Sequence, residues 1–186
     1  YVQIIQDGSN NTTDSAKAGI QLLVEKDFSN TNMAHIIKPA VCILKDIKMP
    51  DTSSGDGGET SVTWDPRDLN TIEGESWFVT LADPIFTLEP GAYEISFSTP
   101  VLISDNCQSR LWDVSNGAAV GYSSQGYSAA AYWSSVENLF NTTVTIGAST
   151  QYRVETIAQT VSAYGYGYRS DEIVSVYTQV KIRKLK

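Results

Sequence analysis

The sequence has 186 residues, enough for one domain and a short extension, with 41% hydrophobic residues to form a core. Its formal net charge of −8 excludes nucleic acid as the expected partner, because phosphate binding needs a basic surface and the basic residues are scattered until the last few positions. No apolar run approaches the roughly 18 residues of a membrane-spanning helix, so we expect no membrane insertion.

The first 39 residues differ from the rest of the chain. A polar, turn-rich stretch at 7–13 precedes residues 19–26, where alternating apolar side chains favour a short strand. A helix over 15–28 is the competing interpretation. Since Pro39 ends the segment, we predict a connector or neck over 1–39 and a main domain over 40–186.

From residue 40 onward, short strands alternate with polar turns. In the first half the predicted strands are 41–47, 61–64, 78–81, 85–88 and 92–98, with a breaker-rich loop at 50–58. In the last of these strands Tyr93, Ile95 and Phe97 share one face.

The second half continues this rhythm. Its predicted strands are 109–114, 141–146, 151–159 and 173–182. The last is predicted to place Val174, Val176, Val180 and Ile182 on one face. Many short strands, without convincing helical periodicity or an internal repeat, predict an all-β sandwich, barrel or jelly roll.

Residues that serve nucleophilic and metal chemistry are scarce. His35 is the only histidine and lies in the connector, where a polar residue near a strand end is the expected role. The chain has no Gly-x-Ser-x-Gly elbow and no phosphate-binding glycine loop. Cys42 and Cys107 match neither a zinc spacing nor a redox pair, so we predict buried free thiols, with a disulfide as the alternative.

Carboxylates are the remaining route to catalysis or metal binding. Asp65 lies close to Asp68 in sequence, and Asp171 is next to Glu172, but all four stand in turn-like contexts where acids cap and solvate the backbone. The acidic loop 51–59 lacks the alternating oxygen ligands of a calcium loop. We therefore expect no enzyme activity, no cofactor and no metal.

Aromatic residues concentrate in two segments rich in Gly and Ser, at 121–133 and 163–168. Rings flanked by small residues offer flat, amphipathic contact area at low entropy cost, and sugar rings stack on such faces. The alternative is that these rings pack in the core or between subunits. The candidate ligand-binding residues are Tyr122, Tyr127, Tyr132, Trp133, Tyr164, Tyr166 and Tyr168.

Three sequence blocks carry a family resemblance. Residues 63–71 match a W-x-x-R-x-L-N-T stretch, and residues 86–95 match F-T-L-x-x-G-x-Y-x-I. Residues 108–117 are close to Q-A-R-L-x-N-x-T-x-G, with Ser, Asp and Ser replacing its Ala, Asn and Thr, and 176–184 resembles the closing strand. In this order, residues 40–186 resemble the C-terminal head of bacteriophage tail fibres, which is similar to the globular heads of complement-type and tumour-necrosis-factor-type proteins.

The resemblance implies an all-β jelly-roll sandwich of about ten strands that assembles as a parallel homotrimer at the distal end of a virion fibre. It implies attachment to a bacterial surface glycan, in capsule or lipopolysaccharide, and upstream tail-fibre or baseplate proteins as partners. Weak sites repeated on several subunits would give strong attachment. The alternative function is a structural trimerisation or cap domain on a longer spike whose enzymatic part lies elsewhere.

No catalytic residue comes with this family, and its binding residues lie in variable loops, so none transfers by position. The segment 121–133 departs from the blocks on either side of it and holds an unusual density of aromatic residues. We therefore expect ligand specificity to lie there.

Overall fold

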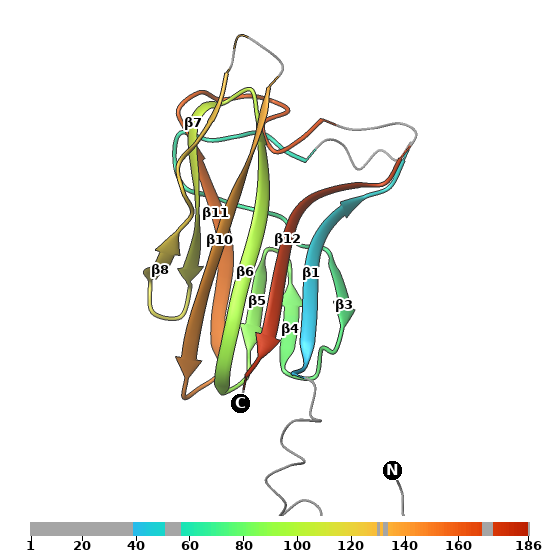
Figure 1. Cartoon of the computed structure of the whole chain (residues 1–186), viewed down its shortest axis with the longest axis vertical. Coiled ribbons are helices and arrows are strands. Elements are labelled where there is room, and N and C mark those ends of the chain that lie inside the picture. Colours follow the sequence, from blue (N-terminus) through green and yellow to red (C-terminus); the bar gives the residue numbers. More distant parts are fainter. Residues whose placement is uncertain (1–38, 51–56, 130, 132–133, 169–172, 186) are drawn as a thin grey trace, which may run out of the picture. The chain divides into compact units, whose positions relative to one another are not determined.

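Two antiparallel sheets packed face to face make up the fold (Figure 1), seen here in a computed structural model that describes residues 39–50, 57–129, 131, 134–168 and 173–185. Sheet A has the strand order β10 (Ser135–Ile146), β6 (Gly91–Leu102), β12 (Ser175–Lys184), β1 (Val41–Lys48) and β3 (Thr71–Gly74). Sheet B has the order β4 (Val79–Ala82), β5 (Ile85–Leu88), β11 (Thr150–Ala158), β7 (Asp105–Asp113) and β8 (Ala118–Tyr122). Two short strands complete sheet B, since β2 (Asp65–Pro66) pairs with β11 and β9 (Gly126–Ser128) pairs with β7.

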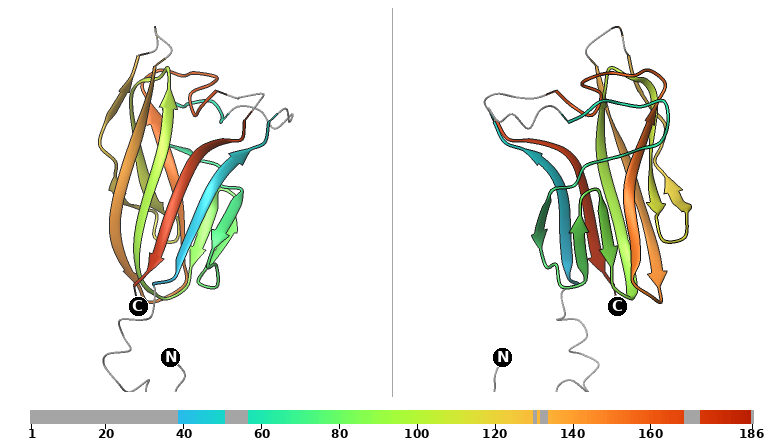
Figure 2. Two further views of the ribbon diagram at one scale, coloured as in Figure 1. Left: turned by 45° about the vertical axis from the view of Figure 1, so that its right-hand side comes forward. Right: turned by 180° about the vertical axis from the view of Figure 1, so that it is seen from behind.

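The chain crosses repeatedly between the two layers, which Figure 2 shows from two further sides. The predicted all-β sandwich is confirmed. Within the part of the chain that the structure describes, no helical segment has the length and hydrophobicity that a membrane span requires. Ala40–Lys186 forms one compact unit, whereas residues 1–38, His35 among them, lie outside the described residues. The connector therefore stays a prediction.

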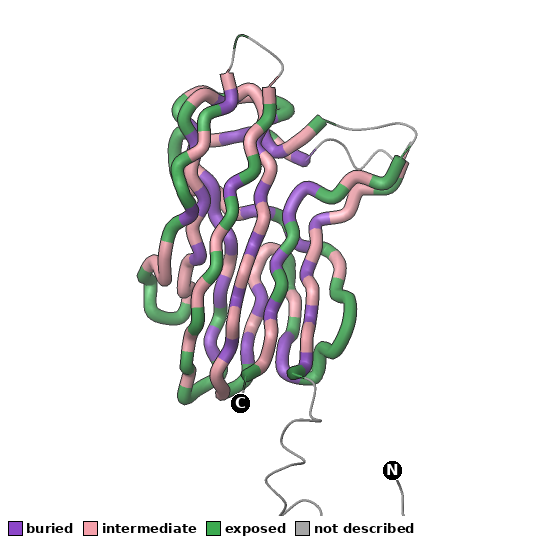
Figure 3. Tube along the Cα trace, viewed as in Figure 1, coloured by how far each residue is buried: buried purple, intermediate pink, exposed green. Residues whose placement is uncertain are grey.

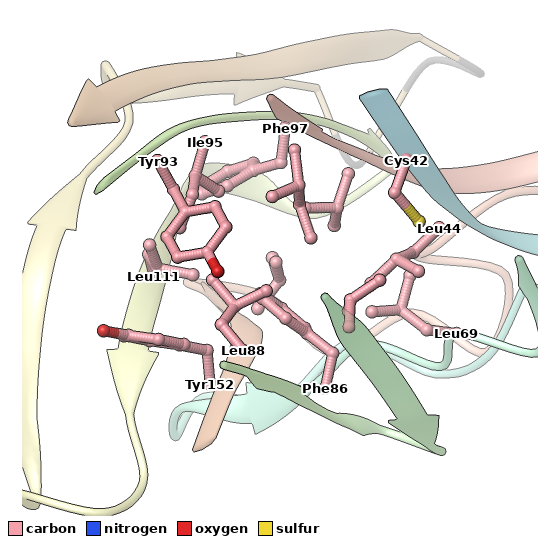
Figure 4. Packing of buried hydrophobic residues seen from close by; sticks show 14 of the residues in the cluster. Cys42, Leu44, Leu69, Phe86, Leu88, Tyr93, Ile95, Phe97, Leu111 and Tyr152 are labelled. Atoms are coloured by element: carbon pink, nitrogen blue, oxygen red, sulfur yellow. The ribbon is translucent and has the colours of Figure 1, made fainter. Parts of the chain in front are cut away.

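The core lies between the sheets and follows from strand alternation. Burial alternates along most strands (Figure 3), because successive side chains point to opposite faces of a sheet. Tyr93 and Ile95 of β6 share one inward face, as predicted, and are fully buried, as is Leu111 of β7. Figure 4 shows inward side chains of both sheets meeting in one cluster with Leu69 from the stretch between β2 and β3; the strand residues include Cys42, Leu44, Phe86, Leu88, Phe97 and Tyr152.

Two turns between consecutive strands contain residues suited to their geometry. The Glu89–Pro90 turn joins β5 to β6, and the Tyr93 hydroxyl donates to the Glu89 carbonyl at 2.7 Å. In the β7–β8 hairpin Gly117 has a φ of 64°, a conformation that favours glycine. These turns fix where β6 and β8 begin.

The block around Arg67 is structural. Its guanidinium is fully buried, donating from Nε to Thr178 Oγ1 at 2.9 Å and from Nη2 to the Tyr177 carbonyl at 2.7 Å. The Arg67 amide donates to Val154 O of β11 at 2.9 Å. Because Thr178 belongs to sheet A and Val154 to sheet B, this one residue links the two layers.

Several predicted strand limits are wrong. Residues 61–64 form no strand, although Ser61 O accepts the Ala158 amide at 2.9 Å and so holds the stretch against the end of β11. The strands β2, β3, β8 and β9 were not predicted. They have two to five residues, too few to display a clear alternation, and the last three contain a glycine.

The predicted apolar face of the last strand is also wrong in its first half. Thr178 pairs with Asp46 but Val176 pairs with Ile47, so Tyr177 is an extra residue on β12. Such a bulge reverses the alternation beyond it. Val174 and Val176 are therefore exposed, whereas Val180 and Ile182 are buried as predicted.

Candidate ligand-binding surface

The outward face of sheet B is defined by the strand alternation of β7. Because Ser109 and Leu111 point into the core, Arg110 and Trp112 point outward. Arg110 lies opposite Glu155 in the β7–β11 ladder, so their side chains share this face. The strand thus brings a cation, an aromatic ring and a carboxylate together.

Two tryptophan rings flank the Arg110 guanidinium. Its central carbon lies 4.2 Å from the Trp64 ring centroid and 4.1 Å from that of Trp112. Guanidinium groups stack on tryptophan through the negative face of the ring. Trp64 comes from the stretch that crosses the end of β11, so residues distant in sequence build this stack.

A buried carboxylate fixes the orientation of two arginines. Glu155 is only 1% exposed; its Oε2 lies 2.5 Å from Arg110 Nε, and its Oε1 accepts from Arg153 Nε at 2.6 Å. Charge-assisted bonds of this kind are short and directional. Both guanidinium groups are therefore held by protein contacts.

Tyr122 extends the stack toward solvent. Its ring centroid lies 5.8 Å from that of Trp64 at an interplanar angle of 50°, and 52% of the residue is exposed. In the β7–β8 ladder it pairs with Arg110. We call Tyr122, Trp64, Arg110 and Trp112 the aromatic row; it offers ring surface at an open sheet face.

The remaining predicted tyrosines divide between two places. Tyr127 of β9 is 63% exposed and pairs with Asn106 of β7, so it lies on the sheet B side of the molecule. Tyr164 and Tyr168 pack edge to face with centroids 5.1 Å apart, and both are exposed. Tyr132 and Trp133 lie outside the described residues.

Tyr166 does not present a surface for a ligand. It is 4% exposed, the Arg67 guanidinium stacks 3.8 Å from its ring centroid, and its hydroxyl donates to Asp65 Oδ2 at 3.2 Å. Burial raises the pKa of Tyr166 well above its usual range. A Cβ on Gly165 would clash with Thr60, so only glycine lets this loop approach so closely. The core alternative therefore applies to Tyr166, and its prediction as a ligand-binding residue is corrected.

Three members of the aromatic row were missed by the sequence-based prediction. Trp64, Arg110 and Trp112 all lie within the blocks that carry the family resemblance, and they were therefore interpreted as signs of the fold. The alternation of side chains along the strand could have identified two of them. If Leu111 points inward, its neighbours Arg110 and Trp112 must point outward.

Side chains that could together bind a metal ion are not grouped in the described part of the chain. Among the described residues no three His, Cys, Asp or Glu side chains form a metal-binding cluster. Cys42 and Cys107 are buried free thiols, as predicted, and burial raises the pKa of Cys42 to about 11. Asp171 and Glu172 lie outside the described residues.

A scan against protein-family models finds no match, and a search of curated proteins finds none either. Solved structures do match. A crystal structure of murine APRIL at pH 5.0 has a TM-score of 0.52 at 11% identity, over 80% of this chain and 100% of that chain. A second, at pH 8.0, gives 0.51 at 12% identity with the same coverage. The globular domain of zebrafish complement 1qA gives 0.49 at 14% identity, over 80% and 98%.

The chain has a C1q/TNF-like jelly-roll fold. At these identities the likeness concerns the fold alone. Folds of this type typically form trimers. The comparisons therefore confirm the predicted fold class, and the ligand has to be argued from the surface itself.

Proposed function

We propose that this chain is the receptor-binding head of a phage tail fibre, a homotrimer that binds a bacterial surface glycan without transforming it. The observation that carries the glycan proposal is the aromatic row, because its exposed Tyr122 ring stands beside Trp64 on an open sheet face. Such rings stack against the C–H face of sugars. The order of the three sequence blocks supports the assignment to a fibre head.

The outward face of sheet A supports self-association. The edge strand β10 and its neighbour β6 carry small polar side chains there, such as Ser96 and Ser98 of β6 and Asn141 of β10. Leu139 stands among them and is 59% exposed. Small side chains permit close approach of two protein surfaces, and an exposed leucine gains from burial. We place the subunit contact on this face, which leaves sheet B to meet the receptor.

Binding of the purified chain to an array of bacterial capsule and lipopolysaccharide glycans tests the proposal. The W64A/Y122A double variant should lose at least about tenfold in apparent affinity, because two stacking rings are removed. W77A is the matched control, since Trp77 is also an exposed aromatic residue but contacts Phe78 and Lys184 and is not part of the aromatic row. This variant should bind like the wild type.

Two results would contradict the proposal. One is wild-type binding to none of the glycans and to none of a strain panel. The other is a double variant that binds as well as the wild type. Loss of the trimer in W64A/Y122A, measured by light scattering, would instead favour the cap-domain alternative, in which the rings pack between subunits.

A further inference from the structure

A pocket of about 430 Å³ opens on sheet B and lies within the usual size range of small-ligand sites. Four amide side chains and two apolar ones contribute to its lining: Asn106, Gln108, Gln125, Gln159, Val62 and Ile157. None of these six carries a charge. The lining is therefore uncharged and combines polar amide groups with apolar side chains.

The pocket adjoins the aromatic row. Ile157 pairs with Gln108 in the β7–β11 ladder, and the next outward pair along it is Glu155 with Arg110. Two residues along a strand span about 7 Å. A ligand longer than one sugar ring would therefore reach from the pocket to the row.

The amides retain both donors and acceptors for a ligand. Asn106 Nδ2 donates to Gln159 Oε1 at 2.6 Å, which leaves Asn106 Oδ1 to accept and Gln159 Nε2 to donate. Gln108 Nε2 donates to Ser123 O at 2.9 Å, which leaves Gln108 Oε1 to accept. Hydroxyl groups both donate and accept, so they match this set.

Tyr127 provides a ring beside the amides. It lies opposite Asn106 in the β7–β9 ladder, and cross-strand neighbours project to the same face of a sheet. A Cβ on the preceding Gly126 would lie 2.6 Å from Asn138 Oδ1, so β9 is seated closely against β10. The ring is thus exposed on a backbone whose position is fixed.

We infer that this pocket binds one uncharged, hydroxyl-rich sugar ring in each subunit, with the amides bonding its hydroxyls and Tyr127 stacking on its C–H face. The inference rests on the proposed function, which it narrows to a site and a ligand class. An acidic sugar would bring a carboxylate against a neutral lining, while the nearby Arg110 and Arg153 are already bonded to Glu155.

Ligand-observed NMR on the full chain tests the inference. The probes are the methyl glycosides of glucose, galactose, mannose and N-acetylglucosamine, with methyl glucuronide as the acidic counterpart. At least one neutral glycoside should bind, and glucuronide should bind more weakly. Y127A and Q159A should each weaken that binding by about tenfold. W77A, at an exposed aromatic residue outside the pocket lining, should change it less than about twofold.

Each contrary result has its own meaning. Preference for glucuronide, binding of no neutral glycoside, or full affinity in Y127A and Q159A would overturn the inference. If the wild type still binds glycans on the array in those cases, the proposed function stands and only the pocket assignment fails. If it binds no glycan in either assay, the proposed function fails as well.

Discussion

The two sheets have similar inward faces and different outward faces. Inward, both contribute fully buried apolar side chains, such as Ile95 from sheet A and Leu111 from sheet B. Outward, sheet B carries the aromatic row and the amide pocket, whereas the described outward positions of β6, β10 and β12 hold no aromatic residue. Inward positions are constrained by the core, so differences in function are expected at the outward ones.

The strongest test of this division is a charge placed on sheet A. L139E should convert the proposed trimer to a monomer, because it places a carboxylate in the proposed subunit contact. Cell binding should then fall by about a hundredfold through lost multivalency, while glycoside affinity per subunit stays unchanged. Light scattering and cell binding measure the two effects.

The matched control is Q151E on sheet B, where Gln151 is also exposed. An unchanged trimer in L139E would refute the assignment of this face.

A second test concerns the residue that joins the sheets. R67A should lower the free energy of unfolding by about 3–5 kcal/mol, because it removes a buried guanidinium and leaves the Tyr177 carbonyl without that donor. The control is R183A: Arg183 pairs with Glu94 at the surface, and its loss should cost less than about 1 kcal/mol. Urea denaturation measures the free energy of unfolding of both variants. Equal losses in R67A and R183A would show that Arg67 contributes no more to stability than a surface arginine.

Alkaline pH should lower the free energy of unfolding through Tyr152, which lies on the inward face of sheet B. Burial raises the pKa of Tyr152 from 10.0 to about 12, so the folded chain keeps this proton after the unfolded chain has lost it. Its contribution to stability is complete below pH 10 and falls as the pH rises to 12, by about 2 kcal/mol. Y152F should show a shallower decline in unfolding free energy between pH 9 and 11. An identical decline in both proteins would assign the effect to other groups.

The smallest effect is expected for the reactivity of the two cysteine thiols, which are buried. Cys42 and Cys107 are buried, and burial raises the pKa of both, so neither should react with a thiol reagent at pH 8 in the folded chain. Both should react in denaturant without reduction. Reaction only after reduction would reveal a disulfide and contradict the structure.

The sequence was informative where burial and alternation agree. The strand 85–88 was predicted with its observed limits. The inward residues of β6 were also predicted correctly, because a long strand with one buried face displays a clear period of two. The bulge at Tyr177 was not predictable, since one extra residue changes the phase without changing the composition.

The candidate surface was predicted only in part. Tyr122 and Tyr127 are exposed and stay predictions as binding residues, but aromatic density alone did not separate them from the buried Tyr166. Trp64 reaches the row, and the amide pocket forms, because segments distant in sequence lie side by side in the fold. Contacts between distant segments leave no pattern in the local sequence. Tertiary pairing, not composition, assembles the surface.

Hydrogen–deuterium exchange of the wild-type chain, with and without a glycan that it binds, tests the central claim most directly. We predict that the ligand slows exchange in β7, β8 and β9, over residues 105–128, and leaves β6, β10 and β12 unchanged. Slower exchange confined to the strands of sheet A, with none in 105–128, would contradict the assignment of the receptor surface to sheet B.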